Sequence, residues 1–144
     1  MDSGIIESMN TTATHLGVAL LVLLAVPACG SDEAVSASSA DAFDAGYNPP
    51  VESTEIFAIR CSVCHGTSGV GDGAAAVALD PKPRNYQDKT WQASVSNEEI
   101  AEIIVKGGAA MGKSALMPPN PDLESKPEVV QGLVFIIREF AKQD

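Results

Sequence analysis

Apolar positions recur with a helical period just before the middle of the chain. Ile56, Ile59 and Val63 stand at i, i+3 and i+7, which is the spacing of one face of an α-helix. The pattern predicts a helix over residues 53–64 with these three side chains on its buried face. The helix would end at Cys64.

A second helix is predicted from Ser96 to the Gly107-Gly108 pair. Ser96 followed three residues later by Glu99 has the spacing of a capping box, in which each residue satisfies a free N–H group of the other. Glycine is common where a helix stops, because it tolerates the left-handed conformation found there. The apolar stripe of this helix consists of Ile100, Ile103 and Ile104.

A third helix is predicted from about Ser125. Ser125 and Glu128 have capping-box spacing again, and Pro127 falls in the first turn, where its missing N–H costs no hydrogen bond. The predicted buried face consists of Val130, Leu133, Val134, Ile137 and Phe140. Three helices without repeats or strand-like segments indicate an all-α domain.

The N-terminal part of the chain is predicted to be an export signal. Leu16 to Val26 form an apolar run too short to span a bilayer but typical of a signal-peptide core. The run leads to Ala28 and Cys29, a sequence that resembles the lipobox of bacterial lipoproteins. We predict a signal peptide over residues 1–28 and a lipid on Cys29. Cleavage after Ala28 by ordinary signal peptidase, giving a soluble periplasmic protein, is the alternative.

The usual basic start of such a signal is missing. Residues 1–15 hold Asp2 and Glu7 but no Lys or Arg. A translation start at Met9 would remove both acids.

The rest divides into a tether and one domain. Residues 29–50 are rich in Ser, Ala and Asp, a composition that buries too little surface to order itself. As a coil they reach roughly 25 Å. Residues 51–144 form one domain, whose size is near the lower limit at which a hydrophobic core alone stabilises a fold. Its Gly- and Pro-rich stretches, 66–89 and 107–123, are longer than compact domains usually allow, which indicates that they wrap a bound group.

The most specific chemistry lies in Cys61-Ser62-Val63-Cys64-His65. CxxCH is the sequence form of a c-type haem attachment site. Two thiols on one helical turn can each add to a haem vinyl group, and the adjacent imidazole can bind the iron. We therefore interpret Cys61 and Cys64 as the covalent attachment points of one haem c and His65 as an axial iron ligand.

Other uses of a CxxC pair fit less well. A structural zinc site needs a second ligand pair, and the remaining candidates, His15 and Cys29, fall in the targeting segment. A thioredoxin-like site needs a strand before its first cysteine, whereas the preceding residues are predicted to be helical. A simple disulfide does not account for His65.

Two methionines compete for the sixth position of the iron. Met117 is followed by Pro118 and Pro119, which stiffen the backbone and hold a sulfur in place at little entropic cost. We predict Met117 as the ligand, with Met111 as the alternative; both could instead fill gaps around the cofactor. A thioether ligand raises the reduction potential of the iron.

Taken together, the domain resembles class I cytochrome c, the small monohaem electron carriers. The resemblance covers about residue 53 to the end. The matching segments are Phe57, CSVCHG at 61–66, GVGDG at 69–73, DPKPRNY at 80–86 and SALMPP at 114–119. It implies an all-α, cytochrome c-like fold of three or more helices, with long loops wrapped around one covalently bound haem. No substrate chemistry is implied.

The resemblance also implies supporting contacts. A proline carbonyl from the loop at residues 81–83 would hold the N–H of His65. The haem propionates would contact Arg84, Tyr86 and Trp91.

The chain departs from the family pattern where its first and last helices should cross. Ser53 stands where a glycine is expected. Leu133 fits, but Ile136 takes the aromatic position and Phe135 precedes it. We expect a looser crossing, or a small rotation that brings Phe135 into it.

The net negative charge of the chain indicates which kinds of partner it can bind. The full chain has a net charge of −10, and the mature chain without residues 1–28 keeps 9 basic and 17 acidic residues. This excess predicts redox partners with basic docking surfaces, and no nucleic acid. A lipid anchor would hold the protein at the periplasmic side of a bacterial membrane.

The predicted function is an exported monohaem carrier of single electrons near that membrane. A haem-bearing subunit of a larger membrane-associated complex is one alternative. A gas-binding or catalytic haem protein with an open sixth site is the other.

Overall fold

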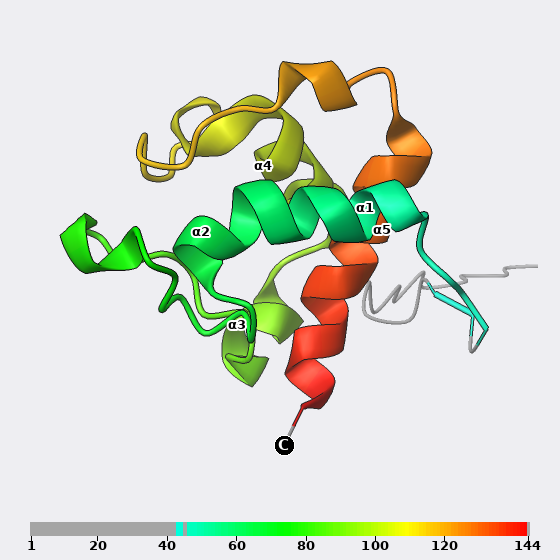
Figure 1. The fold of residues 1–144 in the computed structure, drawn as a ribbon, viewed down its shortest axis with the longest axis horizontal. Coiled ribbons are helices and arrows are strands. Elements are labelled where there is room, and N and C mark those ends of the chain that lie inside the picture. The colour runs from blue at the N-terminus through cyan, green and yellow to red at the C-terminus, as the bar shows by residue number, and fades with distance from the viewer. Residues whose placement is uncertain (1–42, 45, 144) are drawn as a thin grey trace, which may run out of the picture. The chain divides into compact units, whose positions relative to one another are not determined.

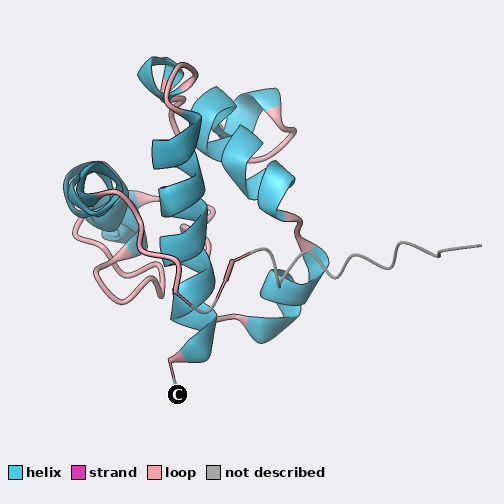
Figure 2. Ribbon diagram, turned by 90° about the vertical axis from the view of Figure 1, so that its right-hand side faces the viewer, coloured by secondary structure: helices cyan, strands magenta, loops and turns pink. Residues whose placement is uncertain are grey.

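The computed structural model describes residues 43–44 and 46–143, which belong to one compact unit. These residues form helices and loops without strands (Figures 1 and 2), which confirms the all-α prediction. The predicted signal peptide, the lipidation site Cys29 and the tether up to residue 42 lie outside the described residues. None of the described helices is long and apolar enough to cross a membrane.

The first predicted helix is present and starts two residues early. It comprises α1 (Val51–Ile56), a π-helical turn η1 (Phe57–Cys61) and α2 (Ser62–His65) in direct succession. Its predicted buried face is correct only at Ile56, which is buried, because Ile59 and Val63 are 73% and 47% exposed. The inward face instead passes through Ser53 and Phe57 to the two cysteines. Residues at i, i+4, i+8 and i+11 share one side of a helix, so Ile59 and Val63 point away from it.

The second helix, α4 (Asn97–Ala110), follows its predicted start and stop. The Ser96 hydroxyl accepts a hydrogen bond from the Glu99 N–H at 3.0 Å. The other half of the capping box is absent, since the Glu99 carboxylate pairs with Lys113 at 3.4 Å. Gly107 interrupts the helix with a φ of 76°. A Cβ there would lie 2.7 Å from the Pro119 nitrogen, so glycine is needed at this stop.

The third helix, α5 (Pro127–Glu139), ends in the short turn η4 (Phe140–Lys142). Pro127 lies in its first turn as predicted. The predicted apolar face is buried: Val130, Leu133, Val134, Ile137 and Phe140. The Ser125–Glu128 capping box is wrong, because Lys126 is the N-cap residue and no side chain caps the helix. Ser125 stands one position too early for that role.

The crossing of α5 over α1 (Figure 1) is close rather than loose. Ser53 is fully buried, and its hydroxyl donates to the Val129 carbonyl at 2.9 Å. A Cβ on Gly132 would lie 2.2 Å from the Ser53 oxygen. In the family pattern, a glycine on the first helix lets the two helices approach closely. Here Gly132 on the last helix has that role.

Phe135 does not replace the missing aromatic at this crossing. Its ring contacts Phe43 at 5.1 Å and Tyr47 at 5.0 Å between centroids, and those two rings are 5.0 Å apart. Phe43 also packs against the core. The folded part of the chain therefore includes residues before the predicted domain boundary at 50.

The short helix α3 (Lys89–Ser94) was not predicted from the apolar pattern, because six residues contain too few turns to show a period. The Asp88 carboxylate caps it by accepting from the N–H groups of Thr90 and Trp91. The buried Arg138 guanidinium ties α5 to this region. It donates at 2.7 Å to the Gln92 side chain and to the Gln92, Val95 and Asn97 oxygens. The described chain also contains short 3-10 turns, η2 (Ala76–Ala78) and η3 (Pro121–Leu123).

Candidate haem-binding site

A cavity of about 510 Å³ lies between the helix that carries the CxxCH residues, the two long loops and α4. Its volume is within the range of small-molecule and cofactor sites. Residues 79–86 line it from the first long loop and residues 113–118 from the second. Both loops therefore surround the cavity, as expected of segments that wrap a bound group.

Cys61 and Cys64 are half-buried free thiols in the cavity wall. Burial raises the pKa of the Cys61 thiol to about 11; Arg60 acts weakly in the opposite direction. Such a thiol is protonated at neutral pH, unlike the thiolates of redox-active cysteines. Among the described residues, no group of three or more His, Cys, Asp or Glu side chains could hold a metal ion. The pair fits covalent attachment of a cofactor better than disulfide exchange or zinc binding.

His65 is buried at the end of α2, where Gly66 closes the helix with a φ of 80°. Its Nδ1 lies 3.0 Å from the Arg84 carbonyl oxygen. An Nδ1–H that donates to this carbonyl leaves Nε2 as the nitrogen with a free lone pair. Burial lowers the pKa of His65, which favours the neutral imidazole that binds metals.

The carbonyl that holds His65 is therefore not the proline carbonyl implied by the family resemblance. The Pro83 oxygen faces Gly71, where a Cβ would come within 2.6 Å of it. The Gly71 N–H in turn donates to the His65 carbonyl at 2.8 Å. The Pro83 oxygen therefore lies against Gly71 and not against the imidazole. The next carbonyl along the chain, that of Arg84, reaches the His65 ring.

Arg84, Tyr86 and Trp91 all line the cavity. The Tyr86 ring is buried and stacks on His65, with centroids 4.4 Å apart and an interplanar angle of 13°. Trp91 lies 5.6 Å from Tyr86, and the Arg84 guanidinium lies 5.7 Å from the Trp91 ring centre. Desolvation raises the pKa of the Tyr86 phenol. The three side chains form one group beside His65, and their contact with haem propionates stays a prediction.

The structure separates the two methionines. Met117 lines the cavity, whereas Met111, the C-cap residue of α4, is not among the lining residues. The Met117 carbonyl accepts from the Gly108 N–H at 3.0 Å. Asn120 donates from its backbone to Val105 at 2.9 Å and from its side chain to Ile104 at 2.8 Å. The two Asn120 bonds use free carbonyls near the end of α4, and all three bonds hold the loop that carries Met117.

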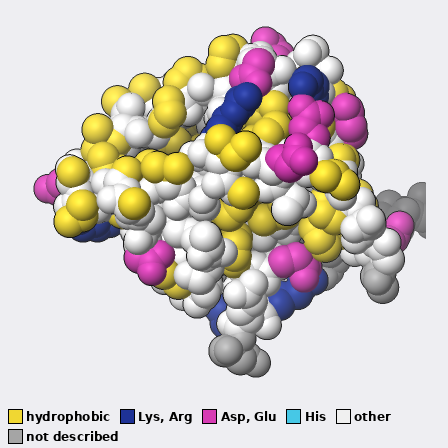
Figure 3. All heavy atoms as spheres, viewed as in Figure 1, with side chains coloured by type: hydrophobic (Ala, Val, Ile, Leu, Met, Phe, Trp, Pro, Cys, Tyr) yellow, Lys and Arg dark blue, Asp and Glu magenta, His cyan; other side chains and the backbone are white. Residues whose placement is uncertain are grey.

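Exposed apolar side chains surround this part of the molecule. On the face shown in Figure 3, hydrophobic side chains gather on the left, over α2 and the neighbouring loops. The large exposed ones from these segments are Ile59, Val63, Val77 and Leu116. Val63 stands between the two cysteines, and Leu116 precedes Met117.

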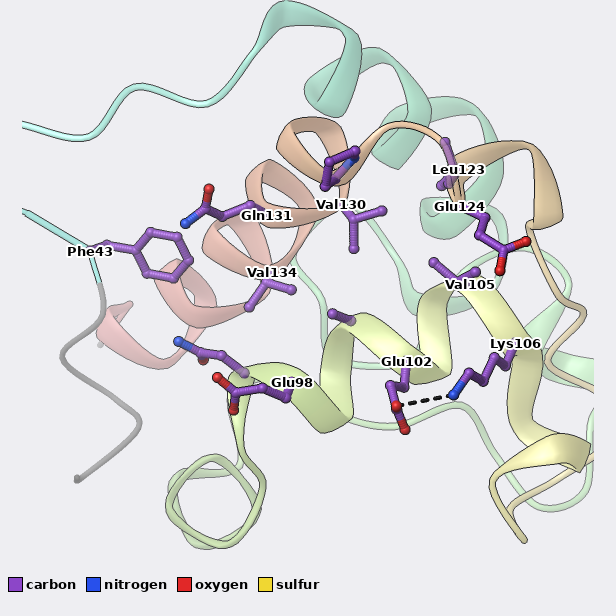
Figure 4. A pocket seen from close by; sticks show the side chains of 13 residues that line it. Phe43, Glu98, Glu102, Val105, Lys106, Leu123, Glu124, Val130, Gln131 and Val134 are labelled. Atoms are coloured by element: carbon purple, nitrogen blue, oxygen red, sulfur yellow. Dashed lines mark hydrogen bonds and ion pairs between the residues drawn. The ribbon is translucent and has the colours of Figure 1, made fainter. Parts of the chain in front are cut away.

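A second hollow of about 430 Å³ lies on another side of α4 (Figure 4). Its apolar wall includes Val105, Val130 and Val134, and Phe43 closes one end. Glu102 at its edge is paired with Lys106 at 3.0 Å. None of the described residues that line this hollow is Cys, His or Met, so they do not supply the ligands that the haem site requires.

An all-helical fold around a cavity with CxxCH in its wall defines a c-type haem protein. The family model described as Cytochrome c matches residues 51–135, more than half of the chain, and this chain belongs to that family. The membership confirms the class I cytochrome c resemblance, a covalently bound haem c as cofactor, and a role in haem-based electron transfer. The cavity, the two thiols and the neutral imidazole fit this group. No curated protein matches the chain.

Proposed function

We propose that this protein carries single electrons between redox proteins at the periplasmic side of a bacterial membrane, with His65 and Met117 as axial ligands of its haem. The main support is that Met117 lines the same cavity as Cys61, Cys64 and His65, although more than fifty residues separate them. When bound, haem c supplies a one-electron couple between ferric and ferrous iron.

The residues of the chain have distinct parts in this proposal. Cys61 and Cys64 hold the cofactor covalently. The Arg84 carbonyl orients the His65 ring and selects its tautomer. Met117 supplies a soft sulfur that favours the reduced iron and raises the potential. A closed, six-coordinate site leaves no position for a substrate, which suits a carrier rather than an enzyme.

The test is the visible spectrum of the oxidised holoprotein. Methionine sulfur on ferric c-type haem gives a weak band at about 695 nm. We expect this band in the wild type and in Met111→Ala, and its loss in Met117→Ala. Met111→Ala is a matched control, because it removes the other methionine sulfur near the end of α4.

Two results would contradict the proposal. Loss of the band in Met111→Ala alone would make Met111 the ligand. Rapid binding of CO to the reduced wild type would indicate an open sixth site, as in a gas-binding or catalytic haem protein. Co-purification with other chains from solubilised membranes would favour the alternative of a subunit in a larger complex.

The surface supports docking of redox proteins near the cavity. The exposed Val63 and Leu116 adjoin the cavity-lining Cys64 and Met117, so a partner that covers them comes close to the cofactor. The net charge of −8 that remains without residues 1–28 would attract partners with basic surfaces.

Export and lipidation at Cys29 form the remaining part of the proposal. Their support is the apolar run that precedes Cys29. Cells that express the full chain should hold it in the membrane fraction, and Cys29→Ser should release it to the periplasm. An unchanged distribution of Cys29→Ser would contradict lipidation.

A further inference from the structure

Arg60 joins two segments that lie far apart in the sequence. Arg60 immediately precedes Cys61. Its guanidinium nitrogen Nη1 lies 3.0 and 2.9 Å from the two carboxylate oxygens of Asp122. The same nitrogen lies 3.4 Å from Asn120 Oδ1. Asn120 and Asp122 follow Met117 by three and five residues. The contact therefore connects the helix that carries the cysteines with the loop that carries Met117.

The other bonds that hold this loop go to α4. Gly108 bonds to Met117, Asn120 bonds to Ile104 and Val105, and Lys113 pairs with Glu99. They fix the loop to one side of the cavity. Asn120 has contacts in both directions, because its amide nitrogen donates to α4 and its amide oxygen faces Arg60. Arg60 thus adds a link from the α4 side to the side formed by the CxxCH helix.

We propose that Arg60 is a positioning residue that holds the Met117 loop closed and so limits access of external ligands to the iron. The inference rests on the proposed His65/Met117 ligation. An external ligand can bind only in the fraction of molecules in which the loop is open, and its apparent affinity scales with that fraction. The side chains of Arg60 and Asp122 are 44% and 51% exposed. A pair this exposed stabilises weakly, which suits control of a local opening rather than of the whole fold.

The experiment measures binding of imidazole to the ferric holoprotein at about pH 8, where imidazole is mostly neutral. We expect Arg60→Gln and Asp122→Asn to keep the band at about 695 nm but to bind imidazole roughly two- to fivefold more tightly, the effect of losing an exposed ion pair. The double variant should bind no more tightly than either single variant, because both remove the same contact. Arg60→Lys, which keeps the charge, should stay closer to the wild type.

Salt supplies an independent readout. Raising the salt to about 1 M shortens the screening length to about 3 Å, so imidazole should bind the wild type more tightly. The affinity of Arg60→Gln should change little. Lys106→Gln is the control, because it breaks a comparably exposed pair with Glu102 on α4 that involves neither Arg60 nor Asp122.

The outcomes separate this inference from the proposed function. No band at about 695 nm in the wild type would overturn both. A normal band with wild-type affinity in Asp122→Asn would overturn the role of Arg60 alone, as would an equal rise in imidazole affinity in Lys106→Gln. Asp122→Asn gives the decisive result if Arg60→Gln fails to attach haem, because Asp122 lies outside the attachment segment.

Discussion

The protein groups that contact the His65 ring are uncharged. Its Nδ1 faces the Arg84 carbonyl, and its ring stacks on Tyr86. A carbonyl selects one tautomer of the imidazole, as a carboxylate would, but adds no negative charge. Less electron density would therefore reach an iron bound by His65 than one bound by a histidine paired with a carboxylate, which agrees with the high potential expected of the proposed His65/Met117 carrier.

Glu98 shows how one residue couples the fold to pH. A hydrogen bond from its own N–H, and then one from the Ser96 hydroxyl, lower the pKa of its carboxyl below the usual value of 4.5. A lowered folded-state pKa stabilises the protein above the unfolded value, and this contribution is lost as the pH falls through the folded value. We expect Glu98→Gln to be less stable than the wild type at about pH 6, and we expect this difference to shrink as the pH falls below 4.5 to about pH 3.

Urea unfolding of the holoprotein, followed by circular dichroism at both pH values, measures this difference. Glu55→Gln is the control, because Glu55 is an exposed glutamate with no hydrogen bond among the described residues. An equal loss in Glu98→Gln and wild type on acidification would show that Glu98 does not contribute.

At the level of the helices, the crossing of α1 and α5 depends on an exchange of small residues. Ser53 is larger than glycine, but Gly132 leaves room for it. The Ser53 hydroxyl also bonds to the Val129 carbonyl, which adds a polar tie that a glycine could not make. Close approach of two helices requires a small residue on one of them, and either helix can supply it.

Gly132→Ala tests this crossing. The added Cβ would lie 2.2 Å from the Ser53 oxygen and 2.8 Å from its Cβ, and such overpacking costs about 1–3 kcal/mol. The helix propensity of alanine offsets about 1 kcal/mol of this. We expect the free energy of unfolding to fall by up to about 2 kcal/mol, measured by urea unfolding.

The same measurement on Gly132→Ala/Ser53→Gly should show partial recovery, because the second change removes the overlapping atoms. Gly46→Ala is the control, since a Cβ at Gly46 meets nothing within 4 Å. A double variant less stable than Gly132→Ala alone would show that the crossing is not limited by this contact.

For the whole molecule, the excess of acidic residues should govern encounters with charged electron donors. With 17 acidic and 9 basic residues after removal of residues 1–28, a net charge of −8, the protein attracts cations at long range, and salt screens this attraction. We expect reduction by the cationic complex hexaammineruthenium(II) to slow severalfold as the Debye length falls from about 30 Å to about 3 Å.

Stopped-flow absorbance of the haem measures these rates. Ascorbate, an anionic reductant, is the control, and its rate should rise with salt. Rates with both reductants that do not depend on salt would show that charge does not steer encounters with this protein.

Part of the fold follows from local sequence. The periods of α4 and α5 and the Gly107 stop depend on residues a few positions apart, so they could be predicted from the chain. The short α3 could not be, because its stability comes from the Asp88 cap and from the distant Arg138. The first helix was predicted in place but with a partly wrong buried face, since contacts with α5 and the cavity decide which side turns inward.

The sequence by itself determined the chemistry of the site, because the two attachment cysteines and the histidine proposed as an iron ligand lie within the five residues from Cys61 to His65. Tertiary structure decided which other groups reach it. The Arg84 carbonyl rather than a proline carbonyl reaches His65, Met117 rather than Met111 lines the cavity, and Arg60 meets Asp122. These contacts join residues 19 to more than 60 positions apart, and no local period or spacing encodes such distances; the packing of the helices and loops around the cavity sets them.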